Sequence, residues 1–135
     1  MAIAVQQMYP VAHLPLMLAV LRRLEVATVI DRLLPSHLAH GLSGGRGVAA
    51  LVLAILDGEH VLYKVGKRLE ERGMLNLLQP GFTRASLHDY RLGHILDALC
   101  AANLHQVLST IALKALEVSA IPTPWRHQDT TTMAL

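Results

Sequence analysis

Cysteine, aromatic residues and net charge are all scarce in this chain. The single cysteine, Cys100, excludes an internal disulfide and is typical of a reducing compartment, so we expect a cytoplasmic location. Aromatic residues make up only 4% of the 135 residues, while Leu, Ala and Val supply most of the apolar content, which favours helices over a β-sandwich. The formal net charge of +2 permits contact with nucleic acid but does not require it.

Long hydrophobic runs are also missing. The longest, Val48 to Leu56, has nine residues, whereas a membrane-spanning helix needs about 20. The apolar stretch from Leu14 to Leu21 has no basic residue before it, unlike a secretory signal. We therefore expect no membrane partner and no signal peptide. The 53% of hydrophobic residues excludes a disordered chain, and the length suits one ordinary domain.

Apolar residues recur at helical spacing over most of the chain. The spacing predicts helices over residues 15–24, 26–34, 48–56, 61–72 and 104–118, with a short helical turn at 74–78. A further helix is expected to be capped by Thr83 or Ser86 and to end near Asn103. Its buried stripe begins at Leu92. Residues 48–56 are apolar on every side, which predicts the central, fully buried helix.

A glycine-rich segment, Gly41 to Gly47, precedes that central helix. It resembles a phosphate-cradling loop at a helix N-terminus, but it lacks the Gly-Lys-Ser/Thr ending of a P-loop and no strand precedes it. We interpret it as a loop within residues 35–47, with Ser43 as a helix cap.

The last eleven residues, Trp125 to Leu135, form a β-prone run that contains Asp129. Asp is depleted in strands, so Asp129 either marks a turn or a frayed terminus, or is presented by a strand to a divalent metal ion. Residues 121–124, with two prolines, predict an extended linker before it. A lone strand cannot satisfy its own backbone groups, so we expect the rest of its domain to be lost from this chain.

The predicted fold is therefore an all-α bundle of five to six helices over residues 1–120, followed by a linker and one isolated β-strand over residues 121–135.

The segment His127-Gln128-Asp129-Thr130-Thr131 resembles the H-x-D-T-T/S strand that opens the catalytic domain of a group of bacterial insertion-sequence transposases. These enzymes belong to the DDE class, which has a ribonuclease-H-like core. Upstream segments resemble, in order and spacing, the helical domain that precedes that core. The segments are Leu14–Leu16 with Leu21–Leu24, Ile30–Pro35, His40–Gly41 with Val48–Gly58, Leu62–Val65, Asp89–Gly93 and Leu96–Leu99.

The resemblance implies that Asp129 is the first of three catalytic carboxylates and a ligand of Mg²⁺ or Mn²⁺ in the intact enzyme. The ribonuclease-H-like domain would be truncated just after this strand, so two of the carboxylates would be absent. We expect this chain to bind no cofactor and to be inactive alone, because one carboxylate cannot build a two-metal site. The implied partner is DNA at the element ends, with a homodimer as a further expectation and no small-molecule substrate.

Four cations are the best candidates for contact with DNA phosphates. Lys64, Lys67 and Arg68 share one face of the predicted helix at 61–72, and Arg72 extends it. The alternative is an ordinary solvated face, since Glu70 and Glu71 dilute the positive charge.

A second function stays open. The same helical pattern suits a free-standing interaction or regulatory module that dimerises and catalyses nothing.

Overall fold

A computed structural model describes residues 2–5, 8–35, 41–122 and 124. These residues form seven α-helices and two 3₁₀ turns, with no strand among them, which confirms the all-α fold class. The elements are α1 (Leu14–Arg23), α2 (Val26–Leu33), α3 (Gly44–Leu56), η1 (Leu62–Lys64), α4 (Val65–Glu71), α5 (Leu75–Leu78), η2 (Arg84–Leu87), α6 (Asp89–Ala101) and α7 (Leu104–Ser119). The expected strand, at residues 125–135, lies outside the described residues. Seven helices replace the expected five to six because the turn at 74–78 closes as the separate helix α5.

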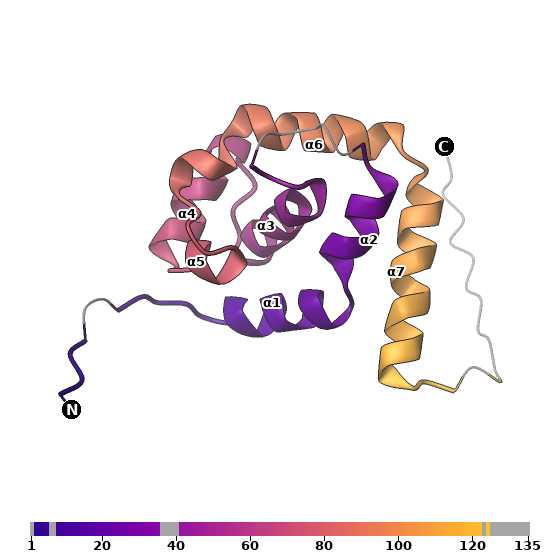
Figure 1. Ribbon diagram of the computed structural model, residues 1–135, viewed down its shortest axis with the longest axis horizontal. Coiled ribbons are helices and arrows are strands. Elements are labelled where there is room, and N and C mark those ends of the chain that lie inside the picture. Colours follow the sequence, from indigo (N-terminus) through magenta and orange to yellow (C-terminus); the bar gives the residue numbers. More distant parts are fainter. Residues whose placement is uncertain (1, 6–7, 36–40, 123, 125–135) are drawn as a thin grey trace, which may run out of the picture.

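Helix α3 occupies the centre of the molecule, as its sequence predicts (Figure 1). It packs against α1, α2, α4 and α6. Leu53, Ala50 and Ala54 on this helix are completely inaccessible to solvent. The main hydrophobic core forms around α3, because an apolar helix reaches its lowest free energy when neighbours cover all of its sides.

The start of α3 corrects the sequence interpretation. The helix begins at Gly44, and not after Gly47, so three glycines assigned to a loop are helical. Ser43 is the N-cap as expected, and its Oγ accepts a hydrogen bond from the Arg46 N–H at 3.1 Å. A second acceptor was not foreseen: the Asp31 carboxylate accepts from the Gly45 N–H at 2.7 Å. Together they satisfy two N–H groups that have no partner within the helix, which offsets the low helix propensity of glycine.

Gly45 lies at the closest point of the crossing between α2 and α3. A Cβ atom at this position would stand 2.0 Å from the carbonyl oxygen of Ala27. Such a separation is far below van der Waals contact, so the two helix backbones can pass this closely only over glycine. Gly45 therefore serves helix packing.

Two more helix boundaries differ from the sequence prediction. The helix expected at 61–72 consists of η1 followed by α4. Thr83 and Ser86 cap η2 through reciprocal hydrogen bonds, with the Thr83 N–H donating to Ser86 Oγ at 3.0 Å. His88 has an extended backbone (ψ 141°), which separates η2 from α6. Its Nδ1 accepts a hydrogen bond from the Tyr90 N–H at 3.2 Å.

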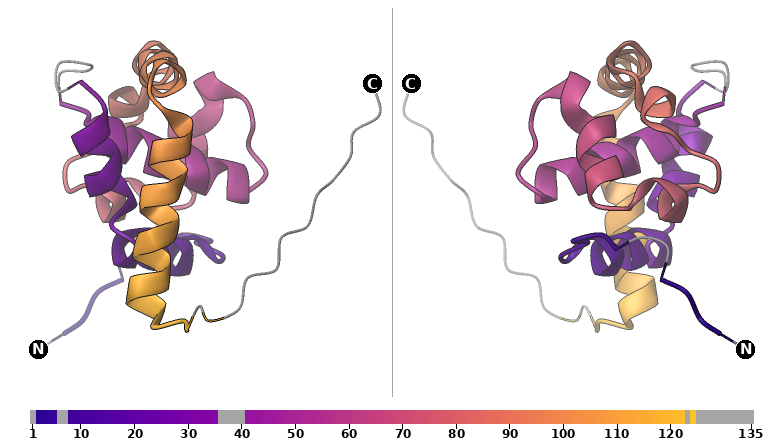
Figure 2. Two further views of the ribbon diagram at one scale, coloured as in Figure 1. Left: turned by 90° about the vertical axis from the view of Figure 1, so that its right-hand side faces the viewer. Right: turned by 90° about the vertical axis from the view of Figure 1, so that its left-hand side faces the viewer.

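Helix α7 lies along α2 at one side of the molecule (Figure 2). A second, smaller cluster of Val26, Ile30, Leu34 and Val107 joins the two helices. Lys114 Nζ forms an ion pair with the Glu25 carboxylate at 2.9 Å, and Arg23 donates to the carbonyl of Val118 at 3.3 Å. Few contacts hold α7, since Val107 is its one fully buried residue.

Replacing Gly45 with Ala should lower the free energy of unfolding by about 1–3 kcal/mol, because the new methyl group forces α2 away from α3. Gly93, in α6, is the matched control, since a Cβ there meets nothing within 4 Å. Gly93→Ala should raise the free energy of unfolding by about 0.5–1 kcal/mol through the better helix propensity of alanine. Urea unfolding followed by circular dichroism measures both. Equal effects of the two substitutions would show that the crossing is not tight.

The ion pair between Glu25 and Lys114 should make the attachment of α7 sensitive to acid. The hydrogen bond from Lys114, then its charge, lowers the pKa of Glu25 below the ordinary value of 4.5, with a smaller contribution from Arg32. A depressed folded-state pKa contributes stability above the unfolded pKa and loses it as the pH falls through the folded pKa. The stability difference between the wild type and Glu25→Gln should therefore shrink between about pH 6 and about pH 3. Urea unfolding at each pH measures it, and a constant difference over this range would contradict the assignment.

Candidate nucleic-acid interface

The four cations singled out in the sequence lie on η1, α4 and the residue that ends α4. Lys64 closes η1, Lys67 and Arg68 belong to α4, and Arg72 is the C-cap. Lys64, Lys67 and Arg68 line one shallow hollow of about 230 Å³ together with Glu59 and Glu71. The structure thus brings three of the four around one depression, with two carboxylates among them.

Arg68 and Arg72 converge on Asp57, which follows the last residue of α3. Arg72 Nε lies 2.9 Å from the Asp57 carboxylate, and Arg68 Nε lies 3.4 Å from the same oxygen. The Asp57 side chain is only 4% exposed, so its charge needs these partners. Arg72 also donates to the carbonyl of Pro10 at 2.8 Å, which fastens the segment before α1. These two arginines therefore hold elements together.

The remaining charges of this surface are partly paired as well. Lys67 lies 3.8 Å from the Glu71 carboxylate, with both side chains more than half exposed, so the pair contributes little. Glu70, which the sequence suggested would dilute the cluster, instead pairs with Arg84 of η2. Lys64 lies over the Tyr63 ring, 5.8 Å from its centroid. Lys64 and Lys67 are thus the cations of this cluster that are best placed to meet a phosphate.

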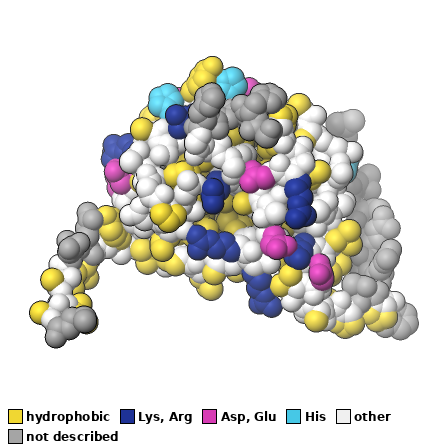
Figure 3. Space-filling model, in the orientation of Figure 1, with side chains coloured by type: hydrophobic (Ala, Val, Ile, Leu, Met, Phe, Trp, Pro, Cys, Tyr) yellow, Lys and Arg dark blue, Asp and Glu magenta, His cyan; other side chains and the backbone are white. Residues whose placement is uncertain are grey.

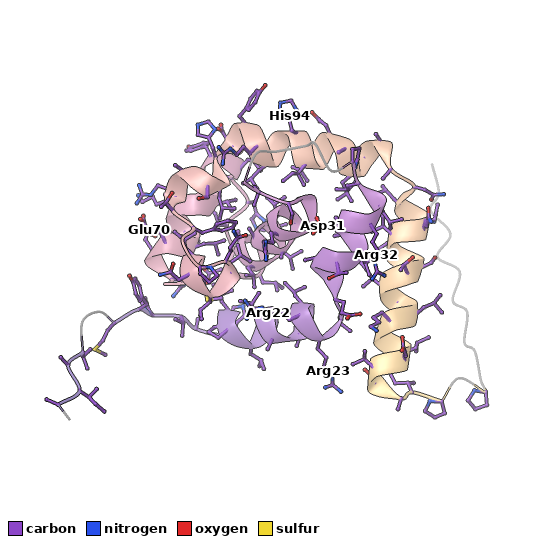
Figure 4. The ribbon with its side chains drawn as sticks, in the orientation of Figure 1. Arg22, Arg23, Asp31, Arg32, Glu70 and His94 are labelled. Atoms are coloured by element: carbon purple, nitrogen blue, oxygen red, sulfur yellow. The ribbon has the colours of Figure 1, made fainter. Side chains whose placement is uncertain are left out.

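A second pair of cations escaped the sequence analysis. Arg22 of α1 and Arg46 of α3 stand at the rim of a hollow of about 360 Å³ that α1, α2, α3 and α5 enclose. Apolar side chains form its floor, and the space-filling view shows apolar surface between basic side chains on this face (Figure 3). Arg22 turns toward the centre of the molecule, whereas its neighbour Arg23 points away (Figure 4). Arg22 donates a hydrogen bond to the carbonyl of Leu77.

These arginines left only faint signals in the sequence. Arg22 is four residues after the buried Leu18, which places it at the edge of the buried stripe of α1. Arg46 is the third residue of α3, a position hidden by the assignment of the glycine-rich segment to a loop. The predicted cap at Ser43 already implied that Arg46, three residues later, lies in the first turn of a helix.

The expected catalytic residue, Asp129, lies outside the described residues, as does His127. Over the described ranges, no group of three or more His, Cys, Asp or Glu side chains is arranged to hold a metal ion. Within the same part of the chain, no single helix is long and apolar enough to cross a membrane. Residues 84–101 and helix α7 pass that test on length and composition only as a pair, bent by 93° where they meet.

Comparison with known proteins gives one match. The profile of a family described as a domain of unknown function, DUF4277, matches residues 6–113. This range contains α1 to α6 and the first part of α7, and with them both pairs of cations described above. No curated protein and no solved structure shows significant similarity to the chain. Since the match covers well over half of the 135 residues, the chain belongs to the DUF4277 family.

Proposed function

We propose that this helical domain is the N-terminal domain of an insertion-sequence transposase of the DDE class and that it contacts DNA. One observation carries the proposal: six segments that resemble the helical domain of those transposases occur in the expected order, and the segment His127–Thr131 follows them. All six segments overlap helices of the bundle, which is consistent with one domain. The protein would act in the cytoplasm, where its DNA substrate lies.

Catalysis in this class needs two divalent ions held about 4 Å apart by three carboxylates, and these ions supply the activated nucleophile and stabilise the leaving oxygen. Asp129 would be the first of the three. A single carboxylate leaves Mg²⁺ with most of its water ligands and binds it weakly. By this resemblance, residues 1–135 supply one of the three carboxylates, and their own contribution would be to bind DNA and, as a further proposal, to pair with a second copy.

Electrostatic contact with DNA would involve Lys64 and Lys67 most directly. Their ammonium groups surround the shallow hollow beside α4, whereas Arg68 and Arg72 are engaged by Asp57. Every phosphate that a protein cation neutralises releases condensed counterions from DNA, so each such contact strengthens the salt dependence of binding.

Purified 135-residue protein should show no Mg²⁺- or Mn²⁺-dependent strand cleavage, because one carboxylate cannot hold two ions. The assay follows nicking of supercoiled plasmid with each metal and with EDTA. Metal-dependent cleavage that disappears in Asp129→Ala would show that the chain is active by itself and would overturn the prediction.

Lys64→Gln and Lys67→Gln should each weaken binding to a duplex probe of about 20 base pairs and reduce the slope of log K against log salt by about 0.9. Fluorescence anisotropy over a salt series measures both quantities. Arg91→Gln removes one positive charge from α6, which contributes no residue to the hollow, and is the matched control that should leave the slope unchanged. Equal effects of all three substitutions would indicate that only net charge matters.

Arg72→Gln distinguishes a residue that contacts DNA phosphate from one that stabilises the fold. Since Arg72 is bonded to both Asp57 and Pro10, this substitution should lower stability more than Lys67→Gln does, because it leaves a nearly buried carboxylate with fewer partners.

The alternative, a helical interaction module without catalysis, also has support. Helix α7 leaves several leucines in solvent, among them Leu108 at 67% and Leu113 at 66% exposure. The genomic DNA after codon 135 discriminates between the two functions. Continuation in any frame into a ribonuclease-H-like sequence with two further acidic residues supports the transposase. Unrelated sequence there, together with a concentration-dependent dimer that Leu108→Asn disrupts, supports the module.

A further inference from the structure

The hollow between α1, α2, α3 and α5 has the build of a small ligand site. Its volume of about 360 Å³ lies at the small end of the range of about 300–1,000 Å³ that is usual for such sites. The floor consists of Leu18, Leu21, Ala49 and Leu78, of which three are at most 5% exposed because they belong to the main core. The floor is aliphatic and is held rigidly by the packing beneath it.

The rim supplies positive charge from two separate helices. Arg22 comes from α1 and Arg46 from the first turn of α3, and no carboxylate of the described chain lies within 4 Å of either guanidinium. Glu25 also lines the rim, but its charge is engaged by Lys114 at 2.9 Å. The Gly45 and Arg46 N–H groups of α3 are already bonded to Asp31 and Ser43. Arg22 uses one of its five N–H groups for the Leu77 carbonyl, so the two arginines supply the positive charge and the further N–H donors for an anion. Guanidinium groups bind carboxylate and phosphate oxygens in pairs of parallel hydrogen bonds.

We propose that this hollow, the Arg22–Arg46 pocket, binds an organic anion with a short aliphatic body. The carboxylate or phosphate of the ligand engages Arg22 and Arg46, and its aliphatic body covers Leu18, Leu21 and Leu78. Among the described residues that line the floor, none has an aromatic side chain on which a nucleic-acid base could stack. A duplex backbone, being convex and charged, reaches the arginines at the rim and leaves the apolar floor uncovered. The inference does not rest on the proposed function.

Octanoate is the probe, and the methyl signals of Leu18, Leu21 and Leu78 in a ¹³C-methyl NMR titration are the readout. Acetate carries the charge without the body, and octanol carries the body without the charge. Each methylene group that leaves water strengthens binding by up to about fourfold, so octanoate should bind at least tenfold more tightly than acetate. N-acetyl-leucine, titrated in parallel, shows whether a free aliphatic acid or a peptide C-terminus fits better.

Arg46→Gln tests the charged rim without disturbing the fold, because Arg46 is exposed and its side chain donates no hydrogen bond among the described residues. It should weaken octanoate binding about tenfold, the loss expected for one charge-assisted hydrogen bond. Arg91→Gln, which removes the same charge from α6, should leave the affinity unchanged. Arg22→Gln should also weaken octanoate binding, but it should lower stability as well, because Arg22 donates to the Leu77 carbonyl of α5. Circular dichroism verifies that each variant is folded.

Four results would overturn the proposal. Octanol binding as tightly as octanoate would reduce the hollow to an apolar patch, and acetate binding as tightly would reduce it to surface charge. An unchanged affinity of Arg46→Gln would remove the arginines from the site. Duplex DNA that shifts these methyl signals, while octanoate does not, would assign the hollow to phosphate contacts of nucleic acid.

Discussion

The crossing of α2 over α3 is the constraint on which the rest of this fold depends. The two backbones meet at Ala27 and Gly45, and the Asp31 carboxylate bonds to the Gly45 N–H beside that point. The packing of α2 on α3 and the hydrogen bond between them thus depend on the same part of α2 and the same first turn of α3. Helix α3 then presents its apolar surface to α1, α4 and α6, and α2 presents its opposite side to α7. A shift of α2 by the width of one methyl group would disturb the second hydrophobic cluster, to which α2 contributes Val26 and Ile30.

Many charged side chains of this protein form ion pairs that join one element of the fold to another. Asp57 pairs with Arg68 of α4 and with Arg72, its C-cap. Glu70 pairs with Arg84, and Glu25 pairs with Lys114 of α7. A basic stripe in a helical sequence can therefore be a set of structural ion pairs. The cations that remain for an external anion are fewer, and they include Arg46, which shares no stripe with the others.

The sequence predicted the all-α class, the central position of α3 and the cap at Ser43, because apolar periodicity and capping residues are local signals. It placed the start of α3 at residue 48, four residues too late, since glycine has low helix propensity and the compensating Asp31 lies fourteen residues from Gly45 in the sequence. It took Thr83 and Ser86 as caps of the following helix, whereas they close the turn before it. The pairing of Arg72 with Asp57 and the pocket beneath Arg22 arise from tertiary packing, which no local pattern encodes. Asp129 stays a prediction that rests on resemblance.

The attachment of α7 has a consequence for motion. The helix extends for sixteen residues, or roughly 24 Å at about 1.5 Å per residue, yet it is joined to the body mainly along one side of α2. An element with so few buried contacts opens at a lower free energy than the body that carries it. Its backbone amides would then exchange with solvent deuterium sooner than those of α3. The protein therefore has a rigid centre and an arm, helix α7, that opens more easily than the centre does.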